Sequence, residues 1–274
     1  MSLNRPVYKL RDWVKPHLHK LNFNYLSENP NSIDFFIKNP NKIVWDCFSR
    51  NPNAIQILYE NQDKINWSSI SENPNAISLI SQNLDKISWW QLSLNPNAIP
   101  ILVENFDNID WVCLSENPNA IPLLLENYDM IDWDALSENS SAIEILKQNK
   151  HKIEYEWLSL NPSAIPLLVE NYDMIDWESL SQNPAAIKLL EENYDNIVFK
   201  WLSVNENAIE ILEKNQDKID WSNLSKNPAI FQLDYEKMRD NNLDIYEDLI
   251  KEVMKPSRVF KERDYDYLEE LFGE

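Results

Sequence analysis

A motif of 22 residues repeats without interruption along most of the chain and dominates what the chain can fold into. Ten asparagines stand 22 residues apart, each with a serine two residues before it and an apolar residue three before it. We call these the anchor asparagines: Asn29, Asn51, Asn73, Asn95, Asn117, Asn139, Asn161, Asn183, Asn205 and Asn227. No insertion breaks the period. The chain is therefore a repeat protein, in which each unit buries its apolar side against its neighbours.

Each unit reads as two short helices joined by tight turns. An aromatic residue and a leucine three positions apart, such as Trp133 and Leu136, suit one face of a first helix. An acid or amide often precedes that aromatic residue and is expected to be its N-cap, as at Asn66, Asp110, Asp132, Asp176 and Asp220. Prolines 100, 122 and 166 belong in the first turn of a second helix. This predicts second-helix N-caps two residues after the anchor, at Asn97, Asn119 and Ser163, and capping boxes pairing Ser141 with Glu144 and Asn207 with Glu210.

The chain contains 35 asparagines, no threonine and a single glycine, Gly273. Helices commonly end on a left-handed residue, and asparagine is the usual substitute for glycine there. A second invariant asparagine, running from Asn39 to Asn215, stands where each second helix should end. We expect it to end that helix in the left-handed conformation.

A leucine-rich repeat has a similar length but needs an apolar residue five positions before the asparagine. That column is mostly polar here: Asn24, Asp46, Ser68, Trp90, Val112, Asp134, Glu156, Glu178, Lys200 and Ser222. The sequence therefore predicts an all-α fold, an α-solenoid of about ten helix-turn-helix repeats over residues 21–233. With helices packed about 8–10 Å apart, it would form a curved rod about 90 Å long.

Both ends depart from the repeat. Residues 1–20 are basic, and Trp13 and Val14 fall in phase with the second helix, so this segment is predicted to be a half-repeat that caps the stack. Residues 234–274 leave the period. They are predicted to form a C-terminal helical cap packed on the solenoid, with helices over 243–254 and 265–272.

The pattern W-x-x-L-S-x-N-P-N-A-I, as in residues 67–77 and 111–121, resembles repeat proteins that giant DNA viruses of protists encode in many copies. The resemblance covers nearly the whole chain, including the segments R-D-W-V at 11–14 and P-S-R-V at 256–259. It implies a viral origin, a helical repeat fold and a reducing intracellular setting, in the host cytoplasm or the virion. It implies no particular activity.

Composition argues against most chemistry. Phosphate-binding loops and nucleophile motifs are missing, so no enzyme activity, cofactor or metal site is expected. Cys47 and Cys113 share a repeat phase three repeats apart, too far for a disulfide, and are expected to be packing variants. His17, His19 and His151 are expected to be ordinary surface residues. No apolar run reaches the length of a membrane span, and no signal-type segment opens the chain.

The charge bears on partners. Acids outnumber bases 45 to 25, for a net charge of −20 and a pI near 4.5. Such a surface repels nucleic acid, so direct nucleic-acid binding is not expected. The same charge attracts basic proteins, although it is also what keeps a repeat protein soluble.

Two surface columns stand out. Aspartates recur at 63, 85, 107, 129, 173, 195 and 217, one per layer, and are expected to bond the backbone two residues on rather than to gather around a cation. The preceding column varies in identity and is aromatic in the central repeats. These aromatics either pack between repeats or anchor a partner, and they are the predicted partner-binding residues: Phe106, Tyr128, Tyr172 and Tyr194.

Three functions follow from these observations. The first is a non-enzymatic scaffold for protein–protein interaction in an infected cell. The second is a structural component of a virus particle. The third is an acidic decoy for basic nucleic-acid-binding proteins. The variation at the aromatic column favours the first, while the partner and the oligomeric state stay open.

Overall fold

The chain divides into two compact units, Leu10–Gln232 and Met1–Lys9 with Leu233–Glu274. The computed structural model describes residues 6–254, apart from the side chains of residues 242–249 and 253. The larger unit is built almost entirely from short helices in a regular repeat, which confirms the predicted all-α repeat architecture. We number the repeats by their anchor asparagines, from Asn29 in repeat one to Asn227 in repeat ten.

Every repeat begins with a first helix of four to six residues. The first helices are α1 (Phe23–Glu28), α3 (Trp45–Phe48), α5 (Trp67–Ile70), α7 (Trp89–Leu94), α9 (Trp111–Glu116), α11 (Trp133–Glu138), α13 (Tyr155–Leu160), α15 (Trp177–Gln182), α17 (Phe199–Leu202) and α19 (Trp221–Leu224). In repeats one to nine a second helix follows the anchor. The second helices are α2 (Ile33–Lys38), α4 (Ile55–Glu60), α6 (Ile77–Ser81), α8 (Ile99–Glu104), α10 (Ile121–Glu126), α12 (Ile143–Gln148), α14 (Ile165–Glu170), α16 (Ile187–Glu192) and α18 (Ile209–Lys214).

Short 3-10 turns connect many of these helices. They are η1 (Lys15–Lys20), η2 (Pro30–Ser32), η3 (Pro40–Lys42), η4 (Pro52–Ala54), η5 (Gln62–Lys64), η6 (Phe106–Asn108), η7 (Tyr128–Met130), η8 (Lys150–Lys152), η9 (Tyr172–Met174), η10 (Pro184–Ala186), η11 (Tyr194–Asn196), η12 (Glu206–Ala208) and η13 (Pro228–Ile230).

The predicted caps of the first helices are confirmed at all five positions. The side chain of Asp132, for example, accepts from the amide of Ala135 at 2.9 Å. The same bond forms at Asn66, Asp110, Asp176 and Asp220.

The predicted caps of the second helices are wrong. Helix α10 begins at Ile121, one residue later than expected, and its N-cap Ala120 has no side-chain bond. Asn119 is not the cap but the capped residue: its backbone amide donates to Oδ1 of the anchor Asn117 at 3.0 Å. The anchor therefore caps the turn that leads into the helix. The predicted capping boxes of Ser141 and Asn207 are replaced in the same way.

The second invariant asparagine is the C-cap of every second helix except α6, whose C-cap is Gln82. It does not adopt the left-handed conformation that was expected. Asn127 has φ −126° and ψ 50°, and its side-chain amide nitrogen donates to the backbone carbonyl of Leu123 at 2.9 Å. No residue among those described has a positive φ. Because no turn of the repeat requires a left-handed residue, the repeats need no glycine.

In repeats two to nine, three apolar positions are fully buried: the residue three before the anchor, the alanine three after it and the residue seven after it. In repeat five these are Leu114, Ala120 and Leu124, all with no exposed surface. The serine two before the anchor is buried as well. Ser115 donates to the carbonyl of Trp111 at 2.7 Å and accepts from the amide of Asp132 in the next repeat at 3.1 Å. A buried hydroxyl with both partners in place costs little to bury.

The anchor asparagines join neighbouring repeats. The amide nitrogen of Asn117 donates to the carbonyls of Ser93 and Asn95, which lie 24 and 22 residues earlier, at 2.8 and 3.0 Å. Every later anchor repeats this pair of bonds, and so do Asn51, Asn73 and Asn95.

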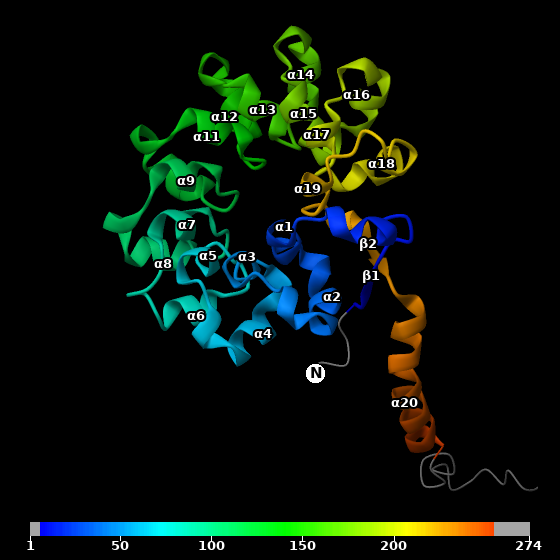
Figure 1. Cartoon of the computed structure of the whole chain (residues 1–274). Coiled ribbons are helices and arrows are strands. Elements are labelled where there is room, and N and C mark those ends of the chain that lie inside the picture. The colour runs from blue at the N-terminus through cyan, green and yellow to red at the C-terminus, as the bar shows by residue number, and fades with distance from the viewer. Residues whose placement is uncertain (1–5, 255–274) are drawn as a thin grey trace, which may run out of the picture. The chain divides into compact units, whose positions relative to one another are not determined.

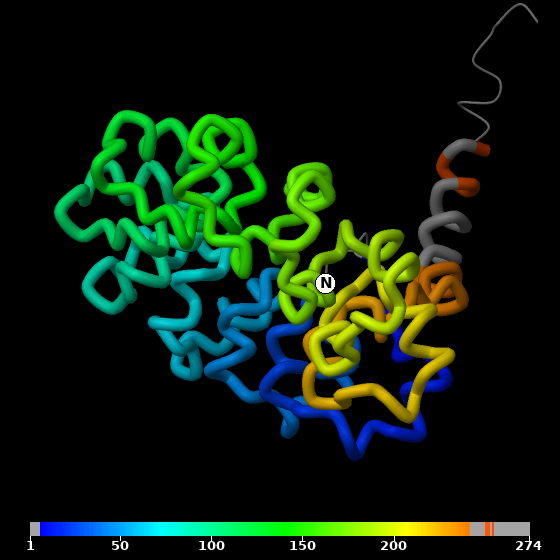
Figure 2. The backbone as a smooth tube through the Cα atoms, turned by 90° about the horizontal axis from the view of Figure 1, so that it is seen from above, coloured from blue at the N-terminus to red at the C-terminus, as the bar shows by residue number. Residues whose placement is uncertain are grey.

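The ladder of anchor bonds closes on itself. Asn29 in repeat one donates to the carbonyls of Ser225 and Asn227 in repeat ten, at 3.2 and 3.0 Å. Repeat one therefore bonds to repeat ten as an eleventh repeat, following repeat ten in the chain, would. The predicted curved rod is therefore wrong: the ten repeats form a ring. Figure 1 shows the first helices on its inside and the second helices on its outside, and Figure 2 shows the first and last repeats side by side.

The N-terminal segment completes repeat ten. That repeat has no second helix of its own, because β2 (Phe231–Leu233) follows η13. The N-terminal segment bonds to the end of η13 at Arg11. The backbone amide of Arg11 donates to the carbonyl of Ile230 at 2.9 Å, and its Nε donates to the carbonyl of Ala229 at 2.7 Å. Val14 then fills the fully buried place seven after the anchor. The half-repeat was predicted over residues 1–20 as a cap of the stack, whereas residues 11–20 join its two ends.

Aromatic and cationic side chains also contact each other between residues 11–20 and repeat ten. His17 is half-buried and packs at a tilt of 46° against Trp221, with 4.4 Å between the ring centroids. Lys20 lies 5.1 Å from the ring of Trp221, in the relation that Lys42 has to Phe23 in repeat one.

The smaller unit contains the start of β1 (Tyr8–Leu10), the end of β2 and helix α20 (Tyr235–Val253). The two strands pair in a two-stranded sheet. The amide of Asp234 donates to the carbonyl of Val7 at 2.8 Å, and its side chain caps α20 by accepting from the amide of Lys237. The predicted helix over 265–272 lies outside the described residues. Within residues 6–254, no helix has both the length and the apolar character needed to cross a bilayer.

Candidate binding surfaces

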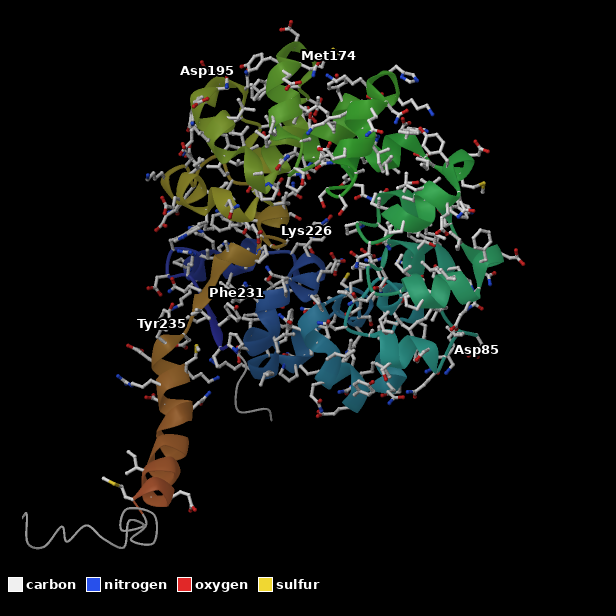
Figure 3. The ribbon with its side chains drawn as sticks, turned by 180° about the vertical axis from the view of Figure 1, so that it is seen from behind. Asp85, Met174, Asp195, Lys226, Phe231 and Tyr235 are labelled. Atoms are coloured by element: carbon white, nitrogen blue, oxygen red, sulfur yellow. The ribbon has the colours of Figure 1, made fainter. Side chains whose placement is uncertain are left out.

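The ring presents two rims of different composition. The second helices and the turns after them form the outer rim, where Asp85, Met174 and Asp195 lie in Figure 3. The first helices form the inner rim, near which Lys226 lies in the same view. On a first helix, the residues one and five positions before the anchor lie on the side opposite the buried leucine. The residue four before the anchor lies at the edge of that side and is buried in repeats three, four, six and eight. We call the surface formed by these three columns the inner face.

The predicted aromatic column lies on the outer rim. Phe106, Tyr128, Tyr172 and Tyr194 are 41–45% exposed. Each ring also packs edge-on against the aromatic residue of the following first helix, with centroids 5.4–6.1 Å apart. The three tyrosine hydroxyls donate to side-chain oxygens in the next repeat, those of Asn149, Asn193 and Asn215. The column thus both joins repeats and presents apolar surface.

Further apolar side chains surround this column. Leu125 and Met130 in repeat five, and Val169 and Met174 in repeat seven, are all about half exposed. In repeat six, lysines at 147, 150 and 152 take the corresponding positions. The apolar surface of the outer rim is therefore two patches, one on each side of repeat six.

The aspartate column lies on the same rim, and every one of its members is exposed. In the described part of the chain, none of the seven makes a hydrogen bond. The expected bond to the backbone two residues on is therefore wrong, and these residues are solvated charges.

The inner face holds functional candidates that the sequence interpretation missed. Trp90 and Val112 are each 51% exposed, and Trp157 is 39% exposed. They stand on the first helices α7, α9 and α13. The signal was present in the column five before the anchor, where Trp90 and Val112 interrupt a polar series, but that column served only to exclude a strand.

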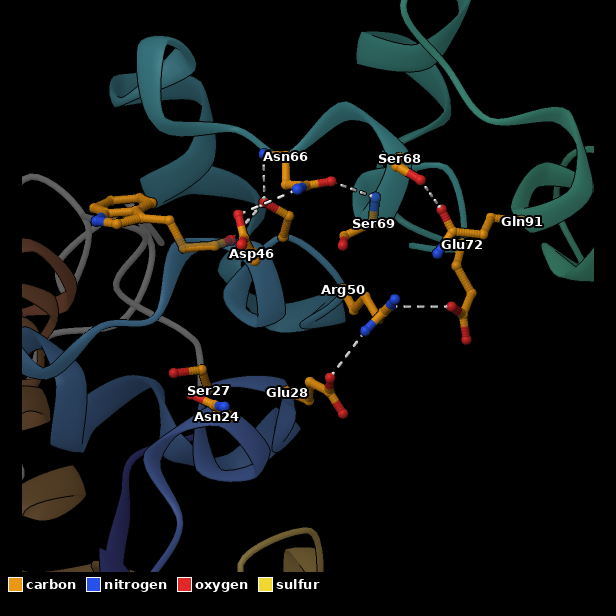
Figure 4. A network of polar contacts seen from close by, with 12 residues as sticks. Asn24, Ser27, Glu28, Asp46, Arg50, Asn66, Ser68, Ser69, Glu72 and Gln91 are labelled. Atoms are coloured by element: carbon orange, nitrogen blue, oxygen red, sulfur yellow. Dashed lines mark hydrogen bonds and ion pairs between the residues drawn. The ribbon is translucent and has the colours of Figure 1, made fainter.

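Arg50 neutralises one part of the inner face. Its guanidinium lies 3.1 Å from Oε1 of Glu28 and 3.2 Å from Oε2 of Glu72, one repeat away on either side (Figure 4). Gln91 and Ser68 contact each other beside this bridge. Burial raises the pKa of Glu72 even so, because the favourable charge of Arg50 does not offset the loss of water and the repulsion from Glu28.

The opposite part of the inner face has acids without cations. The bases of the inner face are Arg50, Lys200 and Lys226, and none lies between Glu116 and Glu178. Glu116 and Glu138 have no ion pair or hydrogen bond among the described residues.

The carboxyl groups of this part respond to their surroundings. Burial, followed by the carboxylates of Glu138, Asp132, Glu72 and Asp110, raises the pKa of Glu116 to about 7. Burial also raises the pKa of Glu138. Each carboxylate is half-buried in a negative environment, which is a site that a cationic group would stabilise.

The cysteines belong to the same face and are both free thiols, as expected. Burial and the nearby carboxylate of Asp110 raise the pKa of Cys113 to about 12. Burial and Glu28 raise the pKa of Cys47. Both thiols therefore stay protonated at neutral pH and are poor nucleophiles.

Comparison with protein-family models, with curated proteins and with solved structures gave no match.

Proposed function

We propose that the chain is a non-enzymatic scaffold for protein–protein interaction, of viral origin and acting inside an infected cell. The helical repeat architecture is compatible with this role. The observation that carries the proposal is the pair of apolar patches on the outer rim, centred on Tyr128 and Tyr172. Large aromatic side chains that are rigidly held and partly exposed are typical anchors of protein interfaces.

The form of the ring supports the same proposal. The ladder of buried asparagines fixes each repeat to its neighbours, so residues on the outer rim hold their relative positions without a partner. A preorganised surface loses little conformational entropy on binding. The outer aromatic column changes in chemical type between repeats, whereas the buried columns keep apolar or small side chains, as a surface adapted to a particular partner requires.

The test is affinity capture from a lysate of infected cells with residues 1–274 as bait, at about 100 mM and about 500 mM salt. Raising the salt over this range screens exposed charge contacts and leaves apolar contacts intact. The informative variant is Tyr128→Ala with Tyr172→Ala. Its matched control is Gln62→Ala with Gln216→Ala, at the same column in other repeats.

A scaffold predicts a discrete partner that survives high salt, is lost with the tyrosine variant and is kept by the glutamine variant. A broad set of basic proteins released by salt would instead favour the acidic decoy. Capture of particle proteins alone would favour a structural component of the virion.

A further inference from the structure

The inner face of repeats four to seven combines three properties that no other part of the ring shares. It exposes Trp90, Val112 and Trp157. Between the two tryptophans lie Glu116 and Glu138, neither of which has an ion pair in the described part of the chain. The cations of the inner face, by contrast, are all in repeats two, nine and ten. We call Trp90, Val112, Glu116, Glu138 and Trp157 the inner arc.

We propose that the inner arc binds a basic segment of a partner protein, about eight residues long and rich in arginine and apolar residues. The arc is an unpartnered face of four neighbouring helices, and charge complementarity decides its occupant. Its acids lie half-buried without counter-ions in the described part of the chain, and the full chain carries −20, so the long-range field also draws in cations.

The length of the segment follows from the helices. Four first helices at about 9 Å spacing span about 27 Å between the outermost axes. An extended chain advances about 3.3 Å per residue, so about eight residues cover the arc. Alternate side chains of an extended segment point to the same side. Four residues of such a segment therefore face the helices, one for each.

The composition of the segment follows from the side chains. A guanidinium pairs with a carboxylate through two parallel hydrogen bonds and stacks on an indole ring, whereas an ammonium is a strongly hydrated point charge. Glu116 and Glu138 flanked by Trp90 and Trp157 offer both contacts, so arginine is preferred over lysine. Val112 and the indole rings accommodate apolar residues that share the helix-facing side of the segment with the arginines.

This surface is separate from the tyrosine patches of the outer rim, and the two proposals fail independently. Tyr128→Ala with Tyr172→Ala leaves binding at the inner arc unchanged. Loss of the inner arc leaves the salt-resistant partner of the outer rim unchanged.

The experiment titrates the full chain with a blocked octapeptide of the order Arg-Arg-Leu-Leu-Arg-Arg-Leu-Leu, which places both arginine and leucine on each side of an extended chain. Binding is measured at about 150 mM salt by calorimetry and tryptophan fluorescence. The same peptide with lysine, and again with glutamate, in place of arginine gives the comparison. We expect one site per chain, binding of the arginine peptide at least about threefold tighter than the lysine peptide, and no binding of the glutamate peptide.

Two variants locate the site. Glu116→Gln with Glu138→Gln removes two charges and is expected to weaken binding about tenfold or more. Asp129→Asn with Asp173→Asn removes two charges from the outer rim and is the matched control, with an expected change within about twofold. Trp90→Ala with Trp157→Ala is expected to weaken binding of the arginine peptide and to remove its preference over lysine.

Three results would overturn the proposal: no binding of the arginine peptide, equal weakening by the inner and outer charge variants, or equal affinity for the arginine and lysine peptides. The second would show a diffuse attraction to the whole ring. The glutamate-to-glutamine variants relieve repulsion, so they are expected to fold. They decide the question alone if the tryptophan variant does not fold.

Discussion

The side-chain amide of Asn29 donates to the backbone carbonyl of Asn227 at 3.0 Å, across 198 residues of chain. The same bond joins each anchor to the one before it along the sequence. The joint between repeats ten and one is thus built like the nine joints that the chain makes through its own continuity. Only the peptide link is missing there, and residues 11–20 take the place of the second helix.

Removal of an anchor amide tests whether the ring is closed in solution. Asn29→Ala and Asn117→Ala each leave two buried carbonyls without a donor and one turn without its cap. We expect each substitution to lower the free energy of unfolding by about 3 kcal/mol, measured by urea denaturation. In an open stack Asn29 would sit at an end, and Asn29→Ala would then cost far less than Asn117→Ala. A much smaller loss of unfolding free energy for Asn29→Ala than for Asn117→Ala would contradict the closure of the ring.

The N-terminal segment is a second test of the joint. Val14→Asp places a charge at a fully buried position of repeat ten and is expected to detach residues 11–20, at a cost of about 3 kcal/mol or more. Small-angle scattering should then show a larger radius of gyration as the ring opens. His19→Asp changes an exposed neighbour on the same segment and should leave the scattering curve unchanged. Similar scattering curves for both variants would count against the closure of the ring by residues 11–20.

Glu116 gives the fold a pH dependence. Its pKa is raised from 4.5 to about 7 in the folded chain, so between these values the folded chain holds a proton that the unfolded chain has released. The free energy of unfolding therefore rises as the pH falls from about 7 to 4.5, and the penalty is fully present above pH 7. Half-exposure limits its size.

We expect Glu116→Gln to raise the melting temperature at pH 8 by about 1–3 °C and to change it little at pH 4.5. Calorimetry at the two pH values makes the comparison. Asp129→Asn, on the exposed outer rim, serves as the control and should shift neither. A larger effect of Glu116→Gln at pH 4.5 than at pH 8 would show that the sign is wrong.

Cys113 should resist alkylation. With a pKa of about 12, its thiolate fraction at pH 8 is about a thousandth of that of a free thiol with a pKa of 9. We expect iodoacetamide to modify native Cys113 at least about a hundredfold more slowly than the same residue in urea, followed by mass spectrometry. Cys47 has a smaller increase in pKa and should react faster than Cys113 in the native chain. The reverse order would contradict the assigned environments.

The local structure of the repeat could be read from the sequence because its causes are local. Aspartate before tryptophan predicted the caps of the first helices, as at Asp132, and proline in the first turn located the second helices. The left-handed conformation expected at Asn127 failed because a side-chain amide bonded to the carbonyl four residues earlier ends the helix equally well. No propensity distinguishes these two ways of stopping a helix.

Ring closure depends on a property that a period does not contain. The 22-residue repeat fixes which residues meet between neighbours, but the rotation from one repeat to the next comes from the packing of many side chains. The sequence still held two clues. Trp13 and Val14 lie in phase with the second helix, and repeat ten lacks a second helix after Ile230. Taken together they describe one repeat divided between the two ends of the chain.

The inner arc was missed for the same reason. Which side of a first helix faces the inside depends on the direction in which the stack curves. In the sequence alone, Trp90 and Trp157 are aromatic residues at two different positions of the repeat. They become a candidate site only when the ring places them on one concave surface with Glu116 and Glu138.

Closure also sets a condition on how such a chain changes in length. An open solenoid gains or loses a unit at the cost of one interface, and recombination between near-identical repeats makes such changes common. In this ring every repeat turns the chain by a tenth of a circle, so an eleventh unit would overlap the first and a ninefold chain would leave a gap. A chain with one unit more or fewer would lose the bonds from Asn29 to Ser225 and Asn227 that close the ring.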